Sequence, residues 1–187
     1  MNEKHLGSVK QYVNDMIGLE RDITNAIKLQ TADDRVSEFP ELQAILSQVV
    51  KASEARLDML KSLSDAEDGG LGAAFKEGIT AVTGTLAGIY GKMREHPVSR
   101  MVRDDIIALD VASVGYGMLY TLGLSTGHEA CAALAIRGVE ETPPLIIALT
   151  DLIPVVVAKE LADDAPLVNP AAVQVARTRI RAAWSKH

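Results

Sequence analysis

Apolar side chains recur along the N-terminal part of the chain with the spacing of one helical face. The positions are Val9, Val13, Met16, Ile23 and Ile27. Gaps of three and four residues place side chains on the same side of an α-helix, which has 3.6 residues per turn. The pattern therefore predicts a helix from about Glu3 to Gln30, with its apolar face packed against other elements.

One carboxylate interrupts this apolar stripe. Glu20 lies four residues after Met16 and three before Ile23, so it shares their face and is expected to point inward. A buried carboxylate is unfavourable unless it is protonated, paired or bound to a metal ion. The sequence leaves two explanations open, a metal ligand or a buried acid with a polar partner. The candidate partners are Arg21, Arg56, Tyr116 and Tyr120.

The remaining apolar stripes predict further helices and no strand, so the predicted fold class is all-α in a single domain. The expected elements are a helical hairpin over 3–64, a linker over 65–72, a helix rich in small residues over 73–94, a second hairpin over 99–162 and a C-terminal helix over 170–184. A polar break at 31–34 separates the first two helices, and Pro40 suits the first turn of the second helix.

Prolines complicate the second hairpin. Pro143 and Pro144 remove two backbone donors, so this point is either a kink or a new helix start capped by Thr142. The apolar run over 145–158 continues as helix and is disturbed again at Pro154.

Composition narrows the possible functions. The 187 residues are 48% hydrophobic and 24% charged, as in an ordinary globular protein. A net charge of −6 argues against a nucleic-acid surface, which needs clustered cations. The apolar run over 145–158 is shorter than the ~20 residues that a membrane-spanning helix needs. We therefore expect a cytoplasmic protein with no membrane span and no nucleic-acid partner.

The sequence contains no recognisable catalytic motif. The four histidines lack metal-site spacing, and no serine lies in a Gly-x-Ser-x-Gly context. His128 is expected at a helix start, and Cys131, the single cysteine, is expected to be a small buried residue. Asp104 and Asp105, together with Asp110, could be ligands, but a charged solvent-facing surface that pairs with Arg100 and Arg103 is the favoured interpretation. We therefore predict no catalytic residue and do not expect an enzyme.

Three segments carry a resemblance to a known superfamily. They are MIGLERDITNAIKLQ (16–30), VSRMVRDDIIALDVASVGYGMLYTLGL (98–124) and ALAIRGVEETPPL (133–145). The chain resembles the ferritin-like superfamily, and in particular stress-associated proteins of the YciE/YciF type and their bacterial relatives. The resemblance implies an up-down four-helix bundle of two helical hairpins, often dimeric, and a role in the stress response.

The resemblance also implies a set of metal ligands. Such proteins place one inward carboxylate on each hairpin and add two Glu-x-x-His pairs. In this chain the corresponding acids are Glu20, Glu54, Asp110 and Glu141. Leu57 stands where a histidine would follow Glu54, and Pro143 and Pro144 stand where one would follow Glu140 and Glu141. The implied cofactor is iron or another divalent metal, in a site that lacks both histidine pairs.

Three functional hypotheses follow. The first is a ferritin-like bundle with a degraded di-metal site and a binding or structural role in a homodimer, whose partner surface is 73–93 or 145–158. The second is a carboxylate-ligated metal-binding protein, either iron-handling or an oxidoreductase. The third is a bundle that encloses an apolar small molecule; a protein partner is also compatible with the apolar surfaces.

Overall fold

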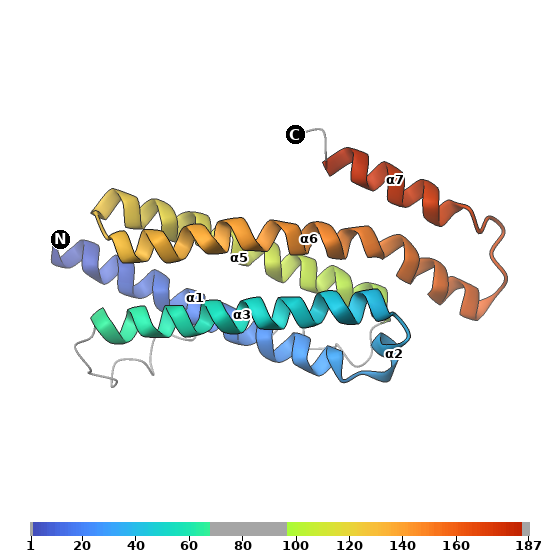
Figure 1. The fold of residues 1–187 in the computed structure, drawn as a ribbon, viewed down its shortest axis with the longest axis horizontal. Helices are drawn as coiled ribbons and strands as arrows, with labels where there is room; N and C mark the ends of the chain where they lie inside the picture. Colours follow the sequence, from blue (N-terminus) through green and yellow to red (C-terminus); the bar gives the residue numbers. More distant parts are fainter. Residues whose placement is uncertain (1, 68–96, 185–187) are drawn as a thin grey trace.

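The computed structural model describes residues 2–67 and 97–184, and within these ranges it contains helices and no strand. The helices are α1 (Glu3–Thr31), α2 (Asp34–Ser37), α3 (Pro40–Glu67), α5 (Val98–Thr126), α6 (Glu129–Asp164) and α7 (Ala172–Trp184) (Figure 1). The predicted all-α fold class is confirmed. The predicted bounds of the long helices agree with the observed ones to within a few residues.

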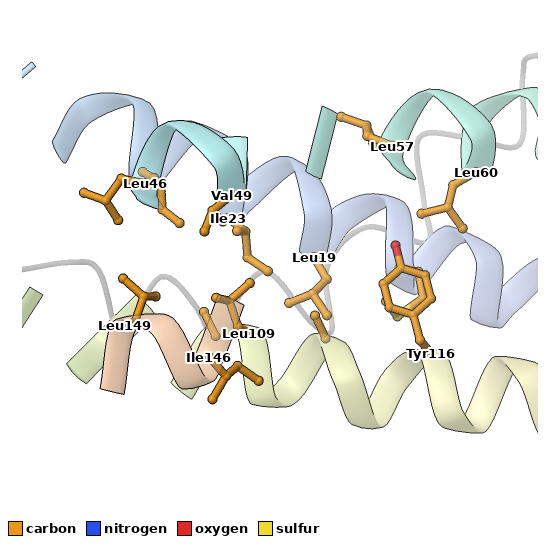
Figure 2. Close-up of a cluster of buried hydrophobic side chains, with 14 of the residues drawn as sticks. Leu19, Ile23, Leu46, Val49, Leu57, Leu60, Leu109, Tyr116, Ile146 and Leu149 are labelled. Atoms are coloured by element: carbon orange, nitrogen blue, oxygen red, sulfur yellow. The ribbon is translucent and has the colours of Figure 1, made fainter. Parts of the chain in front are cut away.

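The four long helices pack side by side as two antiparallel pairs. α1 pairs with α3 and α5 pairs with α6, while α1 also packs on α5 and α3 on α6 (Figure 1). Each long helix contributes fully buried side chains to the shared core, such as Ile23, Leu46, Leu109 and Leu149 (Figure 2). Complete burial of one such side chain contributes about 1.5–3 kcal/mol.

The connections follow local chemistry. The segment between α1 and α3 contains the short helix α2 at the end of the polar break, and the apolar pattern does not predict this helix. Asp33 caps it by accepting hydrogen bonds from the backbone and side chain of Arg35. Gly127 ends α5 with φ +68°, a left-handed conformation that glycine adopts without strain.

The prolines of the second hairpin do not start a new helix. α6 runs without a break from Glu129 to Asp164 through Pro143, Pro144 and Pro154, so the alternative of a new start capped by Thr142 is wrong. Thr142 instead donates its hydroxyl to the Gly138 carbonyl, 2.7 Å away. Proline inside a helix costs about 3 kcal/mol or more. We infer that the buried face of α6 on both sides of the prolines outweighs this penalty.

Some predicted elements lie partly or wholly outside the described residues. The start of the predicted linker, 65–67, belongs to the last turn of α3, and 68–72 lies outside the described ranges, as does the predicted helix over 73–94. The C-terminal helix begins at Ala172 rather than at Pro170.

Within the described ranges, α5 alone is long and apolar enough to cross a membrane, with a third of its apolar window buried. A core helix of a soluble protein also meets this criterion of length and composition.

Candidate functional site

Glu20 points into the middle of the helical packing, as its place in the apolar stripe predicts, and its side chain has no solvent exposure. Arg56 from α3 donates from Nε to Glu20 Oε1 at 2.6 Å and from Nη2 to Glu20 Oε2 at 3.4 Å. Tyr116 from α5 donates its hydroxyl to the same Oε1 at 2.7 Å. The sequence leaves two explanations open for Glu20, a metal ligand or a buried acid with a polar partner. In the structure Glu20 has polar partners, Arg56 and Tyr116.

Arg56 reaches this position because it belongs to the inner face of α3. Val49, Ser53, Arg56 and Leu60 are all buried and follow one another at gaps of four, three and four residues. Arg56 also donates from Nη2 to the Ser53 hydroxyl at 3.3 Å. An apolar stripe traced through hydrophobic residues alone omits Ser53 and Arg56, so it misses that a basic residue lies on the inner face.

The fourth long helix completes the arrangement. Glu141 on α6 brings its Oε2 atom to 3.5 Å from Arg56 Nη1, and its side chain is 36% exposed. Gly138, one turn earlier, lies directly against the ring of Tyr116, where a Cβ atom would clash. Figure 2 shows Tyr116 rising from α5 with its hydroxyl directed toward α1 and α3. We call Glu20, Ser53, Arg56, Tyr116 and Glu141 the core cluster.

The pKa values of Arg56 and Tyr116 are both raised in the core cluster. Burial alone would lower the pKa of Arg56, but the charge and hydrogen bonds of Glu20 outweigh it and raise the pKa above its ordinary value. Burial raises the pKa of Tyr116 well above its usual range, and the negative charge of Glu20 adds to this effect. Tyr116 therefore remains a neutral hydrogen-bond donor and Arg56 a cation throughout the physiological pH range.

Two of the other acids predicted as metal ligands, Glu54 and Asp110, lie away from Glu20. Glu54 is about half exposed and pairs with Lys28 at 2.5 Å on the surface between α3 and α1. Asp110 is exposed, which corrects its expected role as the inward carboxylate of α5. Adjacent side chains on a helix point about 100° apart, and the residue before Asp110, Leu109, is the one that is buried. Asp110 therefore points away from the core.

This arrangement does not fit a metal centre. Residues 2–67 and 97–184 contain no group of three or more His, Cys, Asp or Glu side chains positioned to hold an ion. Two of the predicted ligands, Glu20 and Glu141, each contact the guanidinium of Arg56. The guanidinium of Arg56 already supplies the positive charge that balances these carboxylates.

A second buried polar contact joins α5 to α1, near the N-terminal end of α5. Gln30, near the end of α1, donates from Nε2 to Asp105 Oδ1 at 2.7 Å, and both side chains are buried. Asp104 is also buried and accepts from Arg103 at 2.6 Å. The interpretation of these two aspartates as a solvent-facing surface is wrong, because they lie on the packed side of α5.

His128 and Cys131 lie at the start of α6, where they contribute to the local structure. His128 is the N-cap of α6, and its Nδ1 atom accepts a hydrogen bond from the backbone N–H of Cys131 at 3.2 Å. Cys131 is fully buried, as predicted for a small core residue.

Comparisons with protein-family models, with curated proteins and with solved structures find no match to this chain.

Proposed function

We propose that this protein is a ferritin-like four-helix bundle with a degraded di-metal site, acting as a non-catalytic binding or structural protein in a homodimer. The helix order supports this proposal. α3 ends at one end of the molecule and α5 begins at the opposite end, so these two helices run in the same direction (Figure 1). Two antiparallel hairpins in this relation have the helix order of ferritin-like folds.

The observation that carries the proposal is the contact of 2.6 Å between Arg56 Nε and Glu20 Oε1 at zero exposure. Glu20 is the inward acid that a metal site would use, and here an arginine neutralises it. A divalent cation entering between Glu20 and Glu141 would meet the guanidinium at close range in a poorly screened interior. The protein would then keep the bundle and its central charge balance without metal chemistry.

Elemental analysis of the purified protein tests the proposal against the alternative of a carboxylate-ligated, iron-handling or oxidoreductase protein. We expect iron, manganese and zinc at far less than one ion per chain, and no change in the variant Glu20→Gln. A near-stoichiometric metal that is lost in Glu20→Gln would overturn the proposal in favour of the alternative. The matched control is Glu54→Gln, which changes a surface carboxylate paired with Lys28.

An exposed apolar stripe on α5 supports the homodimer. Ile107, Val114 and Met118 are 41%, 64% and 48% exposed, and the last two line a groove of about 540 Å³ that also contains Tyr12 of α1. Contiguous exposed apolar surface is typical of interaction sites. The stripe differs from the two partner surfaces that the sequence indicates, of which 73–93 lies outside the described residues. Light scattering after size-exclusion chromatography measures the oligomeric state.

The third hypothesis, an apolar small molecule, remains a prediction that the groove on α5 leaves open. A cytoplasmic location and a role in the stress response also remain predictions.

A further inference from the structure

The last helix is attached to the rest of the molecule in a different way from the other helices. α7 packs mainly on α6, and none of its residues is buried. Figure 1 shows α7 running back beside α6, apart from the core of the four long helices. On α6, Asp151 accepts hydrogen bonds from Arg177 and Arg181 of α7 at 2.5 to 3.2 Å. Charge contributes more than hydrophobic burial to the position of this helix.

The charge of the sequence changes sign just before α7. All 25 acidic residues lie at or before Asp164, whereas residues 165–187 contain four basic residues and no acidic one. Such a charge asymmetry is typical of chains in which one part binds an anionic surface. The net charge of −6 therefore reflects an acidic body joined to a basic C-terminal part.

Basic and apolar side chains are separated around α7. One face of the helix carries five apolar residues, Val173, Ala176, Ile180, Ala183 and Trp184. Arg177 and Arg181 border this face on one side, and Arg179 lies beyond its other edge. A basic amphipathic helix with a tryptophan on its apolar face is typical of segments that lie in the interface of a membrane.

The contact with α6 leaves basic and apolar groups of this part of the chain in solvent. Trp184 is 49% exposed and Val175 is 60% exposed, while Val168 in the connector is fully exposed. Arg179 is also exposed. Groups of both kinds, cationic and apolar, therefore remain accessible to a partner while α7 lies on α6.

α7 can leave α6 without uncovering a buried side chain of its own. Residues 165–171 join the two helices, and all of them except Leu167 are exposed. The hydrogen bonds to Asp151 lie near the surface, where water and salt replace a lost partner at little cost. A stronger anionic surface can therefore compete with Asp151 for the two arginines.

We propose that α7 binds the surface of a membrane that contains anionic lipids, with Asp151 as an internal competitor. Each guanidinium of Arg177 and Arg181 donates two hydrogen bonds to the Asp151 carboxylate, and a lipid phosphate offers the same kind of acceptor. At the membrane these arginines exchange Asp151 for headgroups, Arg179 gains a headgroup, and Trp184 enters the interface. The contact goes beyond the homodimer and requires no membrane-spanning helix.

Vesicle binding by the full chain tests the proposal. Trp184 is the single tryptophan, so a blue shift of its emission reports its transfer into the interface. Vesicles of phosphatidylglycerol and phosphatidylcholine should bind the protein and produce this shift. Vesicles of phosphatidylcholine alone should bind roughly tenfold more weakly, and salt should weaken binding to the anionic vesicles. Equal binding to both kinds of vesicle, or binding to neither, would overturn the proposal.

A pair of charge-removing variants tests whether α7 makes the contact. Arg177→Gln with Arg181→Gln should weaken binding to the anionic vesicles about 30-fold. Lys4→Gln with Lys51→Gln is the matched control, because it removes the same charge from exposed positions on α1 and α3. An equal loss in both variants would mean that overall charge, and not α7, governs binding. Duplex DNA that binds α7 as tightly as the vesicles do, without a blue shift, would assign the helix to nucleic acid instead.

The competing role of Asp151 has its own test. Asp151→Asn frees both arginines and should strengthen binding to the anionic vesicles, by up to about fivefold. Asp163→Asn removes the same charge from an exposed position on α6 that pairs with Lys159 and should change binding by less than about twofold. Equal gains in the two variants would contradict competition by Asp151.

Discussion

Two arginine–carboxylate clusters share chemistry and differ in burial: the core cluster, and the contact of Asp151 on α6 with Arg177 and Arg181 on α7. In the core cluster, Glu20 and Arg56 have no exposed side-chain surface and lie among all four long helices. In the second, which we call the Asp151 cluster, Asp151 is 12% exposed, while its partners Arg177 and Arg181 are 24% and 63% exposed. Both clusters have contacts of 2.5–2.6 Å, so geometry alone does not separate them.

The surroundings determine how strongly each cluster resists losing one member. At the surface, water and salt replace a lost partner, and such pairs contribute about 0–1 kcal/mol. In the interior nothing replaces it, and removal of one partner costs about 3–5 kcal/mol because a buried charge is left uncompensated. The core cluster should therefore stabilise one arrangement of the helices, whereas the Asp151 cluster should be reversible.

The largest expected effect is that of removing the buried cation. Arg56→Met leaves Glu20 in the core with the Tyr116 hydroxyl as its remaining partner, so we expect a loss of about 3–5 kcal/mol in the free energy of unfolding. Urea denaturation followed by far-ultraviolet circular dichroism measures it. Replacing these three residues together, with Glu20→Leu, Arg56→Met and Tyr116→Phe, should restore most of this loss, because the buried carboxylate is removed along with its two partners.

The triple variant also distinguishes charge from packing. If it remained as unstable as Arg56→Met, the loss would come from the shape of the arginine stem rather than from the uncompensated carboxylate. A loss below 1 kcal/mol in Arg56→Met itself would contradict the burial of the pair.

An intermediate effect is expected for Tyr116→Phe, which removes the hydroxyl donor to Glu20 and leaves Arg56 in place. A hydrogen bond to a charged group contributes about 1.5–3 kcal/mol, and we expect a loss in this range. Since the pKa of Tyr116 is higher in the folded than in the unfolded protein, its contribution is complete below the unfolded pKa of about 10. The contribution is lost as the pH rises above that value.

The alkaline side of the stability profile tests this sign. Between about pH 10 and 11 the stability of the wild type should fall more steeply than that of Tyr116→Phe, because only the wild type loses a proton from this residue on unfolding. Parallel profiles would contradict a buried, protonated Tyr116. Tyr120→Phe is the matched control, since Tyr120 is partly exposed.

Periodicity was sufficient to predict the fold class. The long helices are recognisable because their buried residues repeat at three and four positions, and this is the signal that packing requires. The short helix α2 was missed because four residues provide too little periodicity. The continuity of α6 could not be predicted, since whether a helix passes through Pro143 and Pro144 depends on what its two halves pack against.

The core cluster was predictable in part. The inward position of Glu20 followed from its neighbours, and Arg56 and Tyr116 were among its candidate partners. The choice between a partner and a metal required the relative rotation of four helices, which no single stripe contains. Asp110 shows that the inward position on α5 could not be predicted to within one residue. The neighbouring Leu109 is in the core, and Asp110 is exposed.

The smallest expected effect on stability is that of opening the Asp151 cluster. Asp151→Asn removes the charge that binds Arg177 and Arg181, and we expect a loss of no more than about 1 kcal/mol. The position of α7 should respond far more than the stability. Trp184, the single tryptophan, lies at the end of α7, so release of the helix should lower its fluorescence anisotropy while circular dichroism of the core stays unchanged.

Acid should release α7 in the wild type in the same way. Hydrogen bonds from Arg181 and Arg177 hold the pKa of Asp151 below its usual value, although partial burial opposes this shift. Its contribution is therefore present above the unfolded pKa of about 3.9 and lost as the pH falls through the lower folded value. The anisotropy of Trp184 should fall below about pH 4 in the wild type, whereas in Asp151→Asn it should already be low at neutral pH. An anisotropy that stays high in Asp151→Asn would mean that apolar contacts, and not Asp151, hold α7 in place. Burial would then not be what makes the loss of a partner matter less in the Asp151 cluster than in the core cluster.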